Sequence, residues 1–109
     1  MEKLKNNLPY LKILSCCSKK IRNKILKSSN KDLINVINEC IINTLNGNVK
    51  LTEKDKEKLA KHKYLLRKLI KNKFVGTKKE ILIQKGGFLQ ILLPSAISLI
   101  ANLLENLKK

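Results

Sequence analysis

The side chains most able to do chemistry in this chain are lysines and arginines that recur between positions 54 and 73. Each ammonium or guanidinium group can neutralise a phosphate, and short intervals along a helix keep several such groups together. A second, shorter group lies between positions 19 and 24. The two groups consist of Lys54, Lys58, Lys61, Lys63, Arg67, Lys68, Lys71 and Lys73, and of Lys19, Lys20, Arg22 and Lys24. The pattern predicts a surface that binds a polyanion.

The charge of the whole chain supports this prediction. The 109 residues include 24 Lys and Arg but only 8 Asp and Glu, so the formal charge is +16. Residues 86–109 carry two lysines and one glutamate, and almost all of the charge therefore precedes them. A field of this sign attracts nucleic acid or an anionic membrane surface. Lysines can also serve only to keep a surface solvated, but that role does not account for the scarcity of acids.

Residue types that support catalysis or metal binding are few and scattered. Cys16, Cys17 and Cys40 lack the spacing of metal ligands, and the single histidine, His62, stands between two lysines. No carboxylate is placed to orient that histidine for nucleophilic chemistry. The cysteines are typical of small apolar residues in a reducing compartment. We therefore expect no catalytic residue, no metal site and no cofactor, and the protein is not predicted to be an enzyme.

The first half of the chain contains residues that typically begin a helix. Pro9 suits the first turn of a helix, so we expect the first helix to begin near it. Ser18 can cap a second helix, in which Ile21, Ile25 and Leu26 would share the apolar face. The basic residues of this helix would then lie on the side that faces solvent.

The rest of the basic region also contains residues that typically begin or end a helix. Ser29-Asn30 resembles a cap before the longest run of apolar residues at helical spacing, and Gly47 should end that run. Thr52 can cap a helix whose apolar stripe runs from Leu59 to Ile70, and Gly76 is expected to break the chain after it. No segment alternates with a period of two. The prediction is an all-α fold, a small bundle of short amphipathic helices.

The composition changes at the two glycines near the C-terminus. We predict a basic helical domain over residues 1–85, a Gly-Gly hinge at 86–87 and an apolar amphipathic tail helix over residues 88–109. Such a helix has to be buried by protein or by lipid, so it lies on a membrane, joins copies of the chain or folds back onto the first domain. The side chains expected to contact a membrane or another copy are Leu92, Ile97, Ile100, Leu103, Leu104 and Leu107.

The residues around the glycines resemble a known protein family. Residues 78–94, in which a basic stretch leads into Gly86-Gly87 and then into an apolar tail, are similar to the X-like core proteins of Maverick/Polinton elements and adintoviruses. Residues 32–39, 45–52 and 61–67 extend this resemblance over most of the chain. The hinge and tail alone also resemble the precursor of the adenovirus core protein X. That protein is dense in Arg, whereas this chain uses Lys.

The resemblance implies a virion component that packs double-stranded DNA and that is present in the host nucleus or cytoplasm during assembly. It also implies cleavage after Gly87 by an adenovirus-type cysteine protease, with Gln84, Gly86, Gly87 and Phe88 forming the recognised site. Glycines suit such a site because a protease cleft needs an extended, narrow backbone, although a pair of glycines can also simply end a helix. The first residues lack the apolar segment of a signal peptide, so secretion by that route is not expected.

These observations lead to one predicted function and one alternative. The prediction is a virion core protein that binds and condenses double-stranded DNA without sequence specificity. Because the cations are mainly lysines, which contact phosphate as point charges, we expect binding that weakens with salt. The alternative is a membrane-active or oligomerising protein that acts through residues 88–109.

Overall fold

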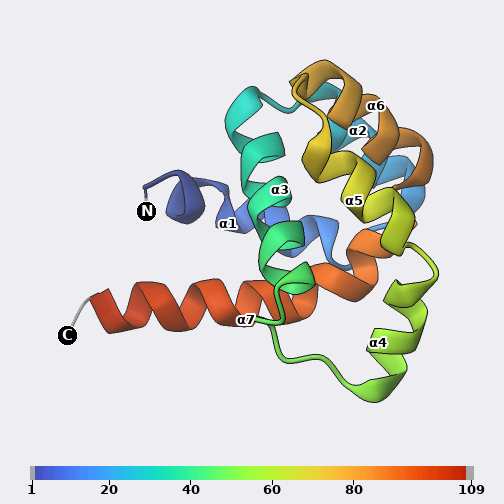
Figure 1. Cartoon of the computed structure of the whole chain (residues 1–109). Helices are drawn as coiled ribbons and strands as arrows, with labels where there is room; N and C mark the ends of the chain where they lie inside the picture. Colours follow the sequence, from blue (N-terminus) through green and yellow to red (C-terminus); the bar gives the residue numbers. More distant parts are fainter. Residues whose placement is uncertain (1, 108–109) are drawn as a thin grey trace.

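The computed structural model describes residues 2–107 of the chain, with side chains described as far as Asn106 (Figure 1). Over this range all regular elements are helical, which confirms the all-α prediction. The elements are α1 (Glu2–Leu14), α2 (Lys19–Ser28), α3 (Lys31–Leu45), α4 (Glu53–Ala60), α5 (Lys63–Lys71), α6 (Val75–Lys85), the short 3-10 helix η1 (Gly86–Phe88) and α7 (Leu89–Leu107).

Local side-chain chemistry fixes several helix ends, as predicted. The side chains of Ser18, Asn30 and Thr52 each accept a hydrogen bond from the backbone N–H three residues later, at 3.3, 3.1 and 3.1 Å. These bonds satisfy N–H groups that have no partner within the helix. At the other end of α3, Gly47 has a φ of 78°, a left-handed conformation that glycine adopts without steric cost. The predicted caps and the predicted stop at Gly47 are confirmed.

Two predicted boundaries were wrong, and one predicted helix is divided in the structure. Helix α1 begins at Glu2 and contains Pro9 in its interior, because the buried Leu11 and Leu14 are held by packing against α3 and α7. Such packing offsets the hydrogen bond that proline removes. The chain also breaks before Gly76 rather than at it, since α5 ends at Lys71 and α6 begins at Val75.

The expected long helix after Thr52 is divided at Lys61 and His62 into α4 and α5. His62 has φ −105° and ψ 5°, and its ring lies 6.1 Å from the ring of Phe88. The turn lets the two halves bury their apolar faces against different partners, α4 against α7 and α5 against α3. A straight helix would present only one of these faces to the bundle.

The first half of α7 lies below α3 and beside α1 in Figure 1, and it packs against both of these helices and against α4. The side chains on its inner side and that of the preceding residue, Phe88, are among the most buried of the described residues. These residues are Phe88, Leu89, Leu92, Leu93, Ala96 and Ile100. Of the three fates considered for the tail, folding back onto the basic helices is the one that the structure shows for residues 88–100.

The second half of α7 extends beyond the bundle toward the C-terminus (Figure 1). Leu103 is 44% exposed there, whereas Leu92 is completely buried. The same helix therefore has a buried segment and a free apolar end.

Two leucines of α7 provide a matched test of this arrangement. Leu92→Ala should lower the free energy of unfolding by about 2–5 kcal/mol, since it leaves a cavity in the core. Leu103→Ala should lower it by less than about 1 kcal/mol, because the side chain is half exposed. Urea unfolding followed by circular dichroism measures both values, and equal effects would contradict a core built around α7.

Candidate nucleic-acid interface

The outer face of α5 carries the densest group of predicted cations. The inner residues Leu66 and Leu69 are buried against α3, which turns Arg67, Lys68 and Lys71 toward solvent. Together with Tyr64 and Asn72, these three cations line an open hollow of about 490 Å³. The structure therefore brings three of the predicted residues together on one surface.

The remaining predicted cations of this region extend the same charged segment. Lys54, Lys58, Lys61, Lys63 and Lys73 are all exposed. In the part of the chain that the structure describes, the ion pairs are Lys3 with Asp32 at 3.6 Å and Lys56 with Glu53 at 3.5 Å. None of the predicted cations takes part in either pair, so their charge is available to an external anion.

The second predicted group, on α2, is divided by the structure. Lys19, Lys20 and Lys24 are exposed, but Arg22 is only 6% exposed. Helix α2 packs mainly against α6, whereas α5 packs mainly against α3, so the two cationic groups belong to helices with different main partners.

The prediction that Arg22 lies on the surface was wrong, and of the predicted inner face of α2 the structure confirms Ile25 and Leu26 but not Ile21. Leu26 and Arg22 point inward, while Ile21 is 48% exposed. The arginine stem lies against Gly86, where a Cβ atom would be 3.5 Å from the arginine Nε. This Nε is buried without a hydrogen-bond partner among the described residues. Arg22 thus contributes to packing at an energetic cost rather than to the charged surface.

The predicted cleavage site is folded rather than extended. Gly86 and Phe88 are buried, Gln84 and Gly87 are exposed, and the turn of η1 joins α6 to α7. Gly86 has φ −78° and ψ 13°, which any residue can adopt. A Cβ at Gly86 would make only ordinary contacts, and one at Gly87 would meet nothing within 4 Å. The fold therefore does not require glycine at either position.

The predicted contact residues of the tail are also divided. Leu92 and Ile100 are buried in the core, Ile97 and Leu104 are half-buried, and Leu103 is exposed. The side chain of Leu107 lies outside the described residues. Val75–Asn106 are long and apolar enough to cross a membrane, with a mean hydropathy of 1.8 over 18 residues, but 33% of that window is buried inside the bundle.

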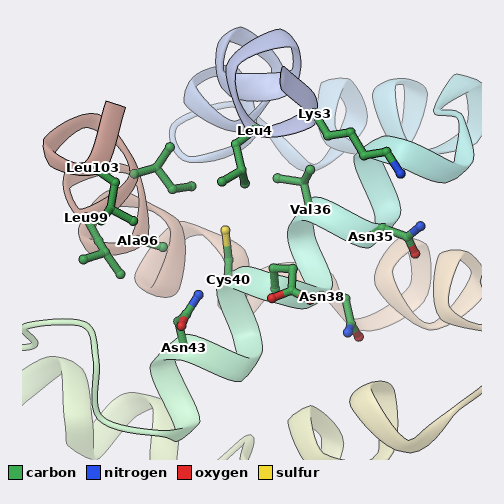
Figure 2. A pocket seen from close by; sticks show the side chains of 12 residues that line it. Lys3, Leu4, Asn35, Val36, Asn38, Cys40, Asn43, Ala96, Leu99 and Leu103 are labelled. Carbon is green, nitrogen blue, oxygen red and sulfur yellow. The ribbon is translucent and has the colours of Figure 1, made fainter. Parts of the chain in front are cut away.

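A groove of about 470 Å³ separates α1, α3 and the far half of α7. Figure 2 shows side chains of the three helices around this space, among them Leu4, Val36, Cys40, Leu99 and Leu103. Burial, and to a lesser extent the charge of Glu39, raises the pKa of Cys40 to about 12. The thiol therefore stays protonated and unreactive near neutral pH. Within residues 2–107 no cluster of three His, Cys, Asp or Glu side chains is placed to hold a metal ion.

The chain was compared with protein families, curated proteins and solved structures. No protein-family model, no curated protein and no solved structure matches this chain.

Two exposed aromatic residues beside the cations were missed by the sequence reasoning. Tyr64 is 81% exposed and Phe74 is 74% exposed. The signal was present for Tyr64, because its spacing from Arg67 and Lys68 places all three on one helical face, opposite Leu66 and Leu69. Phe74 gave no such signal, since its position follows the end of α5.

A pair of variants on α2 tests the assignment of Arg22. Arg22→Met keeps the unbranched stem and removes the unpaired Nε, so it should raise the free energy of unfolding by about 1 kcal/mol or more. Lys24→Met, at an exposed position of the same helix, should change it by less than about 0.5 kcal/mol. Denaturant unfolding compares the two variants. Loss of stability in Arg22→Met would mean that the guanidinium has a partner in solution.

Proposed function

We propose that the protein binds double-stranded DNA through its phosphates, without sequence specificity, and condenses it in a virion core. The observation that carries this proposal is the outer surface of α4 and α5. Residues 53–73 contain nine Lys and Arg against three acids, and the predicted cations among them are exposed and free of the described ion pairs. A duplex presents a dense array of phosphates that matches such a surface.

The placement of the cations supports condensation as well as binding. One group lies on α4 and α5 and the other, reduced to Lys19, Lys20 and Lys24, lies on α2. A single molecule therefore offers cations on more than one helix, and contacts from these helices to two duplexes would draw the duplexes together.

Salt dependence tests this proposal directly. With about six to ten phosphate contacts, the affinity for a random-sequence duplex should fall about 10³–10⁵-fold between 50 and 200 mM salt. Fluorescence anisotropy with a labelled duplex measures this. The double variant Lys68→Ala/Lys71→Ala should reduce the salt slope by about two, while Lys12→Ala, an exposed lysine outside both groups, should leave it nearly unchanged. Weak binding at 50 mM salt, or affinity that does not respond to salt, would contradict the proposal.

Processing after Gly87 forms the second part of the proposal. Glycine costs about 1 kcal/mol relative to alanine within a helix, yet neither Gly86 nor Gly87 is needed for the folded conformation. The two glycines are explained if the chain needs them outside the folded state. A protease cleft, which accepts an extended and narrow segment, creates such a need. The burial of Phe88 means that α7 has to leave the core before the bond is cut.

Release of α7 would also expose the apolar residues that it now buries, which favours membrane action as a second candidate function. Phe88, Leu89 and Leu92 are completely buried while the chain is intact. Once freed, a helix with these residues on one side has the pattern of a peptide that lies in a bilayer interface. Membrane activity would then depend on cleavage.

Alanine variants at the glycines test processing with a matched control. An adenovirus-type cysteine protease should cut the wild-type chain after Gly87, and mass spectrometry would identify the fragment. Gly86→Ala/Gly87→Ala should fold at least as stably and resist cleavage at least tenfold, while Gly76→Ala, in the same run of helices and with open space around it, should be cut at the wild-type rate. Equal cleavage of the three proteins, or no cleavage of the wild type, would contradict the proposal.

The same digest tests the second candidate function, membrane action. Dye-filled vesicles added to it should leak only if cleavage has occurred.

A further inference from the structure

The most exposed large apolar side chains of the described residues are two aromatic rings at the two ends of the α5 cations. Tyr64 lies near the start of α5 and Phe74 lies just after its end, with exposed fractions of 81% and 74%. Large aromatic rings usually contribute to a core or to an interface. Neither ring is used by the core, so their exposure requires a different explanation.

Both rings are attached to an ordered backbone. Tyr64 is within the first turn of α5, and the inward side of that helix is anchored by Leu66 and Leu69. Phe74 donates its N–H to Asn72 Oδ1 at 2.9 Å, and its carbonyl accepts from the Lys78 N–H at 3.1 Å. The exposure of these rings therefore belongs to the folded state and does not come from fraying.

The cations between the rings follow the helical repeat. Tyr64, Lys68 and Lys71 are spaced by four and three residues, and Arg67 lies beside them around the same hollow. The rise of a helix places Tyr64 and Lys71 about 10 Å apart along the axis. The surface is thus a row of phosphate-binding groups with Tyr64 beside them, and Phe74 follows three residues after Lys71 in the chain.

We infer that this surface binds single-stranded nucleic acid, with Arg67, Lys68 and Lys71 on the phosphates and with Tyr64 and Phe74 stacked on unpaired bases. Proteins that bind single strands without sequence preference combine these two elements, because every base has a face on which an aromatic ring can stack. The bases of a duplex are already stacked on each other and offer no such face. The inference rests on the proposed phosphate binding and adds to it a preference for unpaired strands.

An anionic bilayer is the other surface that attracts both lysines and aromatic rings. Binding in a bilayer interface requires a continuous apolar face on the helix. The aliphatic residues of α5 cannot supply one, since Leu66 and Leu69 are buried and Leu65 and Ile70 are half-buried against the bundle. Only the two separated rings remain, and this arrangement favours a nucleic acid over lipid.

The test compares a labelled 20-nucleotide thymidine strand with a duplex of random sequence, using the full-length protein and a series of salt concentrations. Tyr64→Ala and Phe74→Ala should each weaken binding of the single strand about five- to tenfold, the loss of one stacked base, and should change duplex affinity less than twofold. Tyr64→Phe should retain the wild-type affinity, because it keeps the ring. Tyr10→Ala, a half-exposed tyrosine on α1 beside a different hollow, is the matched control and should have no effect.

The possible results separate this inference from the function on which it rests. If the aromatic variants weaken both nucleic acids equally, or neither, the stacking role is overturned while a steep salt dependence of duplex binding would still support the proposed function. If neither nucleic acid binds in a salt-dependent way, the proposed function fails and the inference fails with it. Vesicles of phosphatidylserine and phosphatidylcholine serve as the third ligand. Loss of vesicle binding in Tyr64→Ala, with unchanged binding of the thymidine strand, would assign the rings to a lipid surface and overturn the inference.

Discussion

The burial of the first half of α7 is the interaction on which the rest of the structure depends. Helices α1, α3 and α4 all pack against α7, and the ring of His62, at the turn between α4 and α5, lies beside Phe88. The contacts join parts of the chain that are far apart in sequence, and they add Phe88, Leu89, Leu92 and Leu93 to the core of the basic helices. Helix α5 packs against α3, which itself packs against α7, so the charged surface is tied to α7 through α3.

The stabilisation from the apolar core has to exceed the repulsion between the like charges on the surface. With +16 on 109 residues and two described ion pairs, both exposed, the folded state brings many like charges together. Such repulsion destabilises a compact state. A bound polyanion relieves it, and any ligand that binds only the folded protein also stabilises it. If the protein binds a polyanion as proposed, its binding and folding would be coupled through charge. The buried, unpaired Nε of Arg22 is a second, local contribution that destabilises the folded state.

The sequence predicted those features that depend on local chemistry. The caps at Ser18, Asn30 and Thr52 and the stop at Gly47 were identified because each involves residues within one turn of the helix end. The break at His62 and the inward rotation of Arg22 arise from contacts with α6, α7 and η1, to which no local pattern points. The charge of the candidate surface was predictable, since lysines are seldom buried. Its aromatic rings were not, because an aromatic residue stays exposed only where no other part of the fold packs over it.

The order in which the chain is made gives the buried segment of α7 a further consequence. Synthesis proceeds from the N-terminus, at about 5–20 residues per second, so all of the basic helices are made before residues 88–100 are added. Helices α1, α3 and α4 then lack the partner that completes their core. Until residues 88–100 are added, the strongly cationic chain lacks the segment that closes its core. Completion of the core therefore has to wait for a segment that is made after all of the basic helices.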